Sequence, residues 1–203
     1  MPGPLRRATH VVAQLDAAID ERVDRFRGHP HTDRLMYAAS ELGDFSLVWH
    51  LLNTGRALAP DRRLGHAVRI AVLLGAESGL VNGPVKTLFR RHRPAWQQDR
   101  PLRLRRPRTS SFPSGHASSA MTAAGLLAQR DPLWPLYYAV GAVVASSRVY
   151  VRTHHPSDVI AGAVLGIALA RVARRAWPFP EALTRTNASN PECGDASQGL
   201  DPA

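Results

Sequence analysis

Three stretches of the chain lack charged side chains, and they constrain the fold more than any other feature. They lie within the segments 44–56, 131–148 and 158–171 and consist mainly of Ala, Gly, Val, Leu and Ser. Small residues of this kind let helices approach one another closely in lipid. No stretch reaches the roughly 20 predominantly apolar residues that define an unambiguous membrane span, and the mean hydropathy is −0.20. The segments become long enough to span a bilayer when their arginine ends are included.

The pattern predicts an all-α integral membrane bundle of about five to six helices. We expect the main helices at these positions: Met36–Leu58, Leu64–Phe89, Ser114–Ala128, Leu133–Val151 and Ser157–Ala173. Arg69 and Glu77 fall inside the second of them and must therefore face protein or water. On composition alone, a soluble helical protein is the alternative.

A chain of 203 residues suits a single main domain, which we place at 34–177. In the segment 1–33, apolar residues recur at helical spacing opposite a charged face. This indicates an amphipathic helix lying on the bilayer surface, or one packed on a soluble core. The tail 178–203 is polar and reads as disordered. No secretory signal is visible, which argues against export as a free soluble enzyme, and the lone Cys193 can form no intrachain disulfide.

The first candidate site cluster surrounds the only lysine. Of 26 basic residues 25 are arginine, in a chain of net charge +10, and Lys86 is the exception. Its compact ammonium differs physically from the planar guanidinium of arginine. Lys86 and Arg93 lie where a predicted helix ends before Pro94, because the residue before a proline disfavours helix. Both cations therefore border a polar loop.

A second cluster, Pro113-Ser114-Gly115-His116, reads as the start of a helix. Ser114 is a typical N-cap, and glycine permits a close backbone approach. Free N–H groups and the helix dipole at such a start bind phosphate well. His116, one step into the helix, could reach an ester oxygen. On its own, this four-residue motif more often marks an ordinary helix start.

The third cluster joins Ser147-Arg148 to His154 and Asp158. Pro156 opens a helix, and Asp158 falls in its first turn, where the helix dipole favours an acid. Its spacing from His154 would let the carboxylate accept a hydrogen bond from one ring nitrogen, which leaves the other nitrogen free as a nucleophile. A capping Asp beside two surface histidines is the alternative.

Together, the three clusters resemble the type 2 phosphatidic acid phosphatase (PAP2) superfamily. Its pattern is Lys, six residues, Arg-Pro; then Pro-Ser-Gly-His; then Ser-Arg, five residues, His, three residues, Asp, and every fixed letter occurs here in order. The match runs from Lys86 to Asp158 and selects His154 rather than His155. The resemblance implies a PAP2/haloperoxidase-like helical core.

The resemblance also implies a lipid phosphatase that works through a phosphohistidine, with no metal and no cofactor. His154 would attack phosphorus, Asp158 would orient it, and His116 would protonate the leaving group and then activate water. The remaining motif residues would hold the phosphate oxygens: Lys86, Arg93, Ser114, Gly115 and Arg148. No acidic cluster suited to Mg²⁺ is visible in the sequence.

The expected partners are the bilayer and a lipid phosphate: a polyprenyl phosphate or diphosphate, a prenyl-linked sugar phosphate, phosphatidic acid or phosphatidylglycerol phosphate. The short chain leaves little room for an extra headgroup domain, which favours an isoprenoid substrate of bacterial envelope synthesis. The apolar helices, together with the resemblance, predict a multi-pass protein of the cell membrane. Eight arginines lie between positions 90 and 108. Apart from Arg93, we expect them in a solvated loop at the membrane surface. Contact with a lipid headgroup or diphosphate is the alternative, and nucleic-acid binding is not expected because Trp96 is the only aromatic residue there.

The arginine distribution predicts that the motif face lies in the cytoplasm. Two rival functions remain on sequence grounds. Vanadate-dependent haloperoxidases resemble the same three clusters, although they are much larger and soluble. A non-catalytic membrane protein that binds or transports lipid phosphates would also retain the anion site. A soluble acid phosphatase is disfavoured by the missing signal, and the oligomeric state is not indicated.

Overall fold

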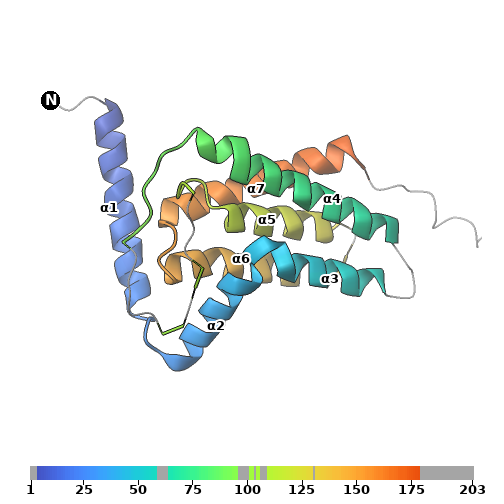
Figure 1. Ribbon diagram of the computed structural model, residues 1–203, viewed down its shortest axis with the longest axis horizontal. Coiled ribbons are helices and arrows are strands. Elements are labelled where there is room, and N and C mark those ends of the chain that lie inside the picture. Colours follow the sequence, from blue (N-terminus) through green and yellow to red (C-terminus); the bar gives the residue numbers. More distant parts are fainter. Residues whose placement is uncertain are drawn as a thin grey trace, which may run out of the picture.

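The computed structural model describes residues 4–58, 64–95, 101–102, 104–105, 109–129 and 131–178 (Figure 1). These residues form helices and no strands, which confirms the predicted all-α bundle. There are seven α-helices in this part of the chain, more than the five to six expected: α1 Pro4–Asp24, α2 Pro30–Leu42, α3 Leu47–Ala57, α4 Leu64–Leu80, α5 Gly115–Leu127, α6 Trp134–Tyr150 and α7 Pro156–Ala176. Two short elements, η1 Asp44–Ser46 and η2 Val81–Val85, follow α2 and α4.

Helix α5 is the centre of the bundle, packed most extensively against α7 and α6 and also against α4. Its inward positions are small, and Ala117, Ala120 and Ala123 are fully buried. Larger side chains, among them Trp49 and Tyr137, complete the core around it. Interiors pack as densely as organic crystals, so an alanine-rich central helix lets its neighbours lie close.

The contact between α5 and α7 is made backbone to backbone. A Cβ atom on Gly162 would lie 2.3 Å from the Ser114 carbonyl oxygen, and one on Gly166 would lie 2.2 Å from that of Ser118. Only glycine permits so close an approach. These two residues form a glycine stripe on α7. The stripe lets the start of α5, which carries the second sequence cluster, lie against the start of α7, which carries part of the third.

The expected single helix Met36–Leu58 is wrong, because the chain breaks at η1 into α2 and α3. Phe45 and Ser46 have φ angles of 53° and 58°, a left-handed conformation that L-residues avoid. Tertiary packing imposes the turn: a Cβ on Gly43 would lie 2.8 Å from the His116 ring and 2.9 Å from Val144. A straight helix would not follow this surface of α5.

The second predicted helix is also modified near its end. Regular α-helix stops at Leu80, and the chain continues as the π-turn η2, which contains Pro84. Proline supplies no backbone donor, and single π-turns occur often at functional sites. The turn leads directly to Lys86.

Two segments are long and apolar enough to cross a membrane, namely Leu64–Val85 and Pro156–Ala176. Large apolar side chains are exposed along the outer faces of α3, α4, α6 and α7, including Leu51, Val72, Leu136 and Val164. Arg69 and Glu77 turn inward, 2% and 5% exposed, as predicted for charges inside an apolar helix. These four helices thus present large apolar side chains outward, while Arg69 and Glu77 lie inside the bundle.

Helix α1 lies across one end of the bundle, nearly perpendicular to its long helices (Figure 1). It docks by its polar side: Asp16 is 5% exposed, whereas Val11 and Leu15 are more than half exposed. Val11 and Leu15 therefore do not pack on the helical core, whereas Val23, at the end of the same apolar stripe, contacts the buried cluster of Tyr37, Tyr150 and Val151. Of the predicted tail 178–203, all but its first residue lies outside the described residues, and so do Cys193 and Trp96.

Candidate active site

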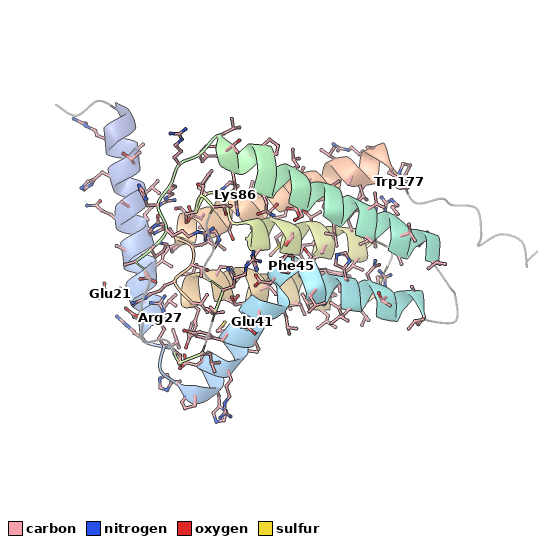
Figure 2. The ribbon with its side chains drawn as sticks, viewed as in Figure 1. Glu21, Arg27, Glu41, Phe45, Lys86 and Trp177 are labelled. Carbon is pink, nitrogen blue, oxygen red and sulfur yellow. The ribbon has the colours of Figure 1, made fainter. Side chains whose placement is uncertain are left out.

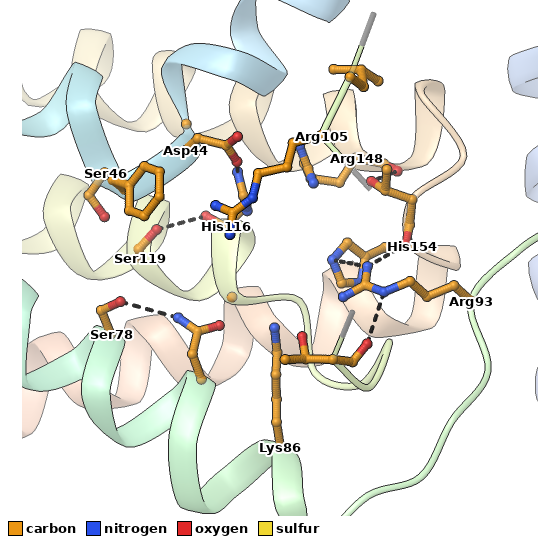
Figure 3. A pocket seen from close by; sticks show the side chains of 17 residues that line it. Asp44, Ser46, Ser78, Lys86, Arg93, Arg105, His116, Ser119, Arg148 and His154 are labelled. Carbon is orange, nitrogen blue, oxygen red and sulfur yellow. Dashed lines mark hydrogen bonds and ion pairs between the residues drawn. The ribbon is translucent and has the colours of Figure 1, made fainter. Parts of the chain in front are cut away.

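A cavity of about 720 Å³ opens at the same end of the bundle as Lys86 and Phe45, away from Trp177 (Figure 2). Six of the eight predicted site residues line it: Lys86, Arg93, Gly115, His116, Arg148 and His154 (Figure 3). The other two, Ser114 and Asp158, are fully buried and do not line the cavity. Segments far apart in the sequence thus meet in one cationic cup.

Backbone carbonyl groups hold Arg93 in place at the cup, and Lys86 is buried there. Arg93 donates to the carbonyl oxygens of Thr153 at 2.7 Å, Thr109 at 3.1 Å and Ser110 at 3.1 Å. Lys86 is 8% exposed. Burial, together with the positive charges of Arg93 and Arg148, lowers the pKa of Lys86 to about 8. The cup is pre-shaped for an anion.

The start of α5 has the predicted N-cap. The Ser114 hydroxyl accepts from the Ala117 N–H at 3.4 Å, and the Ser114 N–H donates to the Asp158 carbonyl at 3.0 Å. A Cβ on Gly115 would lie 2.6 Å from the Asn82 amide oxygen, so glycine lets that side chain reach the helix start. The Ser114 hydroxyl therefore caps the helix from behind the cup.

The two ring nitrogens of His154 have different partners, and these set its tautomer. Nδ1 lies 2.7 Å from the Ser111 carbonyl oxygen, and Nε2 lies 3.1 Å from a guanidinium nitrogen of Arg93. A carbonyl can only accept and a guanidinium can only donate. Nδ1 therefore carries the hydrogen, and Nε2 presents its lone pair. Burial lowers the pKa of His154 to about 3, so the imidazole is neutral near pH 7.

Asp158 does not make the direct hydrogen bond expected from its spacing. Its Oδ2 atom is 3.8 Å from the His154 Nδ1 and instead accepts from the Ser111 hydroxyl and from the His155 N–H, the latter at 2.9 Å. Ser111 stands between the two groups because its carbonyl meets the imidazole and its hydroxyl meets the carboxylate. Ser111 lies outside the sequence pattern, and no motif signals its role.

Arg91 was expected in a solvated loop, and that expectation is wrong. Its guanidinium donates to Asp158 Oδ1 at 2.7 Å and to Asp16 Oδ2 at 2.6 Å. Asp16 also accepts from the N–H and the hydroxyl of Ser157, both at 2.8 Å. Arg91 thus joins α1 to the carboxylate behind His154.

Asp44 is a further acidic side chain that sequence reasoning missed. It lines the cavity from η1, with one carboxylate oxygen 2.8 Å from the His116 Nε2. Within the described residues no three His, Cys, Asp or Glu side chains are grouped as metal ligands.

Four cations, Lys86, Arg93, Arg105 and Arg148, line the cavity together with the two histidines. Such a set at the end of a helical bundle defines a phosphate-handling enzyme. Residues 66–180 match the sequence profile of the PAP2 superfamily. The chain belongs to this superfamily and is a phosphatase.

Similar proteins agree with this assignment. The chain is 35% identical over 127 residues to a decaprenylphosphoryl-5-phosphoribose phosphatase of Mycolicibacterium smegmatis, covering 62% of this chain and 68% of that protein. It is 44% identical over 63 residues to an undecaprenyl-diphosphatase of Sulfolobus acidocaldarius, covering 30% of this chain and 31% of that protein. The crystal structure of a transmembrane PAP2 type phosphatidylglycerolphosphate phosphatase from Bacillus subtilis superposes with a TM-score of 0.64 at 23% identity, covering 82% of this chain and 86% of that one. This last likeness confirms the fold.

Proposed function

We propose that this protein is a metal-independent lipid phosphatase embedded in the bacterial cell membrane, with His154 as its nucleophile. The observation that carries the proposal is the fixed tautomer of His154. Its Nε2 lone pair faces a cup lined by Lys86, Arg93 and Arg148. A neutral imidazole beside three cations suits attack on an anionic phosphorus centre.

In the first step Nε2 forms a bond to phosphorus as the ester P–O bond breaks. His116 gives its proton to the departing oxygen, and the electron pair of the broken bond stays with that oxygen. In the second step water attacks the phosphohistidine, His116 takes a proton from this water, and the P–N bond breaks to release phosphate. Asp158, through Ser111, keeps the His154 ring in the reactive tautomer.

The cup supplies the charge stabilisation of the reaction. Lys86, Arg93, Arg148 and the N–H groups at the start of α5 would contact the non-bridging oxygens. Arg93 contacts Nε2, and phosphate oxygens are stronger acceptors for its guanidinium. We therefore propose that the incoming phosphate draws Arg93 off the nucleophile.

For the substrate we propose a prenyl-linked sugar phosphate. The cavity extends beyond the cup along Ser46, Ser78, Asn82 and Ser119, and hydroxyl and amide groups suit a hydroxylated headgroup. The name of the Mycolicibacterium relative supports the same class. The apolar outer faces of the long helices suit a lipid tail, and a multi-pass arrangement would place the cup at the bilayer surface.

The test is a panel of lipid phosphates assayed on the detergent-solubilised enzyme with and without EDTA. We expect turnover of the prenyl-linked sugar phosphate to be unchanged by EDTA. A loss that Mg²⁺ restores would contradict the metal-free mechanism. Denaturing the enzyme during turnover of a ³²P-labelled substrate should leave acid-labile, alkali-stable label on the wild type and none on His154→Ala. Full turnover by His154→Ala would overturn the nucleophile, and halide oxidation with added vanadate would indicate haloperoxidase chemistry instead.

A further inference from the structure

The turn between α2 and α3 places one carboxylate against the second histidine of the site. Asp44 is followed by two residues in the left-handed conformation, Phe45 and Ser46, and neither is glycine. Strained backbone of this kind persists only where the surrounding structure imposes it, and it concentrates at functional sites. Here the turn directs the Asp44 side chain toward His116 (Figure 3).

The edge of the His116 ring that faces this turn is well defined. Nε2 lies 2.8 Å from Asp44 Oδ1, close enough for a hydrogen bond although not aligned as one. The neighbouring Cδ2 atom faces Gly43, where an added Cβ would come within 2.8 Å of it. The Cδ2–Nε2 edge is therefore enclosed by the turn, and Nδ1 lies on the opposite edge of the ring.

The carboxylate is ionised in this setting. Burial alone would raise the pKa of Asp44, but His116 and the nearby Arg148 and Arg105 guanidinium groups outweigh burial, and the net pKa is lowered. A fixed negative charge beside Nε2 stabilises the protonated imidazole. Burial and the Arg148 charge disfavour that protonated form, and Asp44 opposes both of them. The protonated form is the one that a general acid requires.

We propose that Asp44 is a positioning residue that holds His116 by Nε2, favours its protonated form and leaves Nδ1 to exchange the proton with the leaving group. Asp44 stays ionised throughout. The Nδ1 proton goes to the departing oxygen, and a water proton returns to Nδ1 when the phosphohistidine is hydrolysed. This inference rests on the proposed function, because it needs His116 as the general acid.

Leaving-group dependence tests the inference, because a general acid matters for an alkoxide and little for a nitrophenolate. The quantity to compare is kcat/KM, which covers the steps up to departure of the leaving group. For Asp44→Asn we expect kcat/KM to fall about 30-fold or more on an alkyl lipid phosphate. On p-nitrophenyl phosphate we expect a change of less than about threefold. Equal losses on both substrates would overturn the proposal, since they would indicate a structural defect.

A double-mutant cycle supplies the second readout. In a His116→Ala background, Asp44→Asn should cost little more on the alkyl substrate, because Asp44 acts through the missing ring. Additive losses would contradict the inference. The matched control is Glu41→Gln, an exposed carboxylate in the last turn of α2, three positions before Asp44, which should behave as wild type. If Asp44→Asn fails to fold, Asp44→Glu keeps the charge and should retain the leaving-group dependence of the wild type.

The phosphohistidine mechanism and the role of Asp44 can be refuted independently. Full activity in His154→Ala would remove the phosphohistidine mechanism itself. A wild-type pattern in Asp44→Asn, with His154→Ala inactive, would leave that mechanism standing and remove only the role of Asp44.

Discussion

Lys86 differs from the other cations of the cup because its charge is lost within an accessible pH range. Its pKa is lowered from 10.5 to about 8, whereas guanidinium groups stay protonated. Raising the pH through this value removes one positive charge from the free enzyme and weakens phosphate binding. We expect kcat/KM for a lipid phosphate to decline above pH 8, approaching about tenfold per pH unit.

The variant Lys86→Arg tests the origin of this decline. A guanidinium at position 86 would remain charged, so the alkaline decline should move to higher pH even if the maximal rate is reduced by the larger side chain. The measurement is the pH profile of kcat/KM for both proteins. An unchanged alkaline limb in the variant would show that another group causes it.

Arg91 acts on the nucleophile from outside the cavity. Its substitution by alanine removes the partner of Asp158 Oδ1 and loosens the group that, through Ser111, holds the His154 tautomer. We expect kcat to fall about tenfold or more with KM little changed, as for other positioning partners one layer behind a site. The neighbouring Arg90, which is exposed, provides the matched control Arg90→Ala. A similar loss in that control would refute the specific role.

The sequence motifs predict the residues that line the cup but not the residues that position them, and the difference has a physical reason. Lys86, His116 and His154 sit at helix ends, and local rules predict helix ends. Ser111, Arg91 and Asp44 act through contacts with segments distant in the chain: Ser111 and Asp158 are 47 positions apart, and Arg91 and Asp158 are 67 apart. Their roles depend on how the helices pack, which no local pattern encodes.

At the scale of the elements, the glycine stripe of α7 sets the distance between the second and third clusters. In Gly166→Ala the new Cβ would meet the Ser118 carbonyl at 2.2 Å, and a backbone atom cannot rotate away. We expect a loss of stability of about 3 kcal/mol or more, at the upper end for overpacked sites, together with loss of activity. Gly75→Ala on α4 is the control, because nothing lies within 4 Å of its Cβ position; a helix-interior alanine there should raise stability by about 0.5–1 kcal/mol.

The measurement is the midpoint of thermal unfolding of both glycine variants in the same detergent. Equal midpoints for the two would show that α7 can move away from α5 without penalty.

Some helix boundaries follow from local sequence, and others follow from tertiary packing. The last three helices were predicted to within a few residues, since caps and prolines mark them. The break at η1 was not, because it follows from the fit of Gly43 against α5.

At the scale of the whole molecule, the orientation predicted from the arginines can be tested by cysteine labelling. Ser111, although on the motif face, is fully buried and unsuitable. Leu88 beside the site and Leu58 at the opposite end of the bundle are 78% and 81% exposed. In a Cys193→Ser background, a membrane-impermeant maleimide applied to intact cells should label Leu58→Cys and spare Leu88→Cys. Labelling of Leu88→Cys instead would place the cup outside the cytoplasm.

The anchoring of α1 through Asp16 has a practical consequence for anyone who trims this protein for crystallisation. Deleting residues 4–28 would remove the carboxylate that Ser157 and Arg91 share and leave a charged guanidinium to reorganise beside Asp158. A shortened enzyme could then fold and bind phosphate and still be slow. The cause would be the lost Asp16 contact, which lies beside the catalytic residues although α1 is distant from them in sequence.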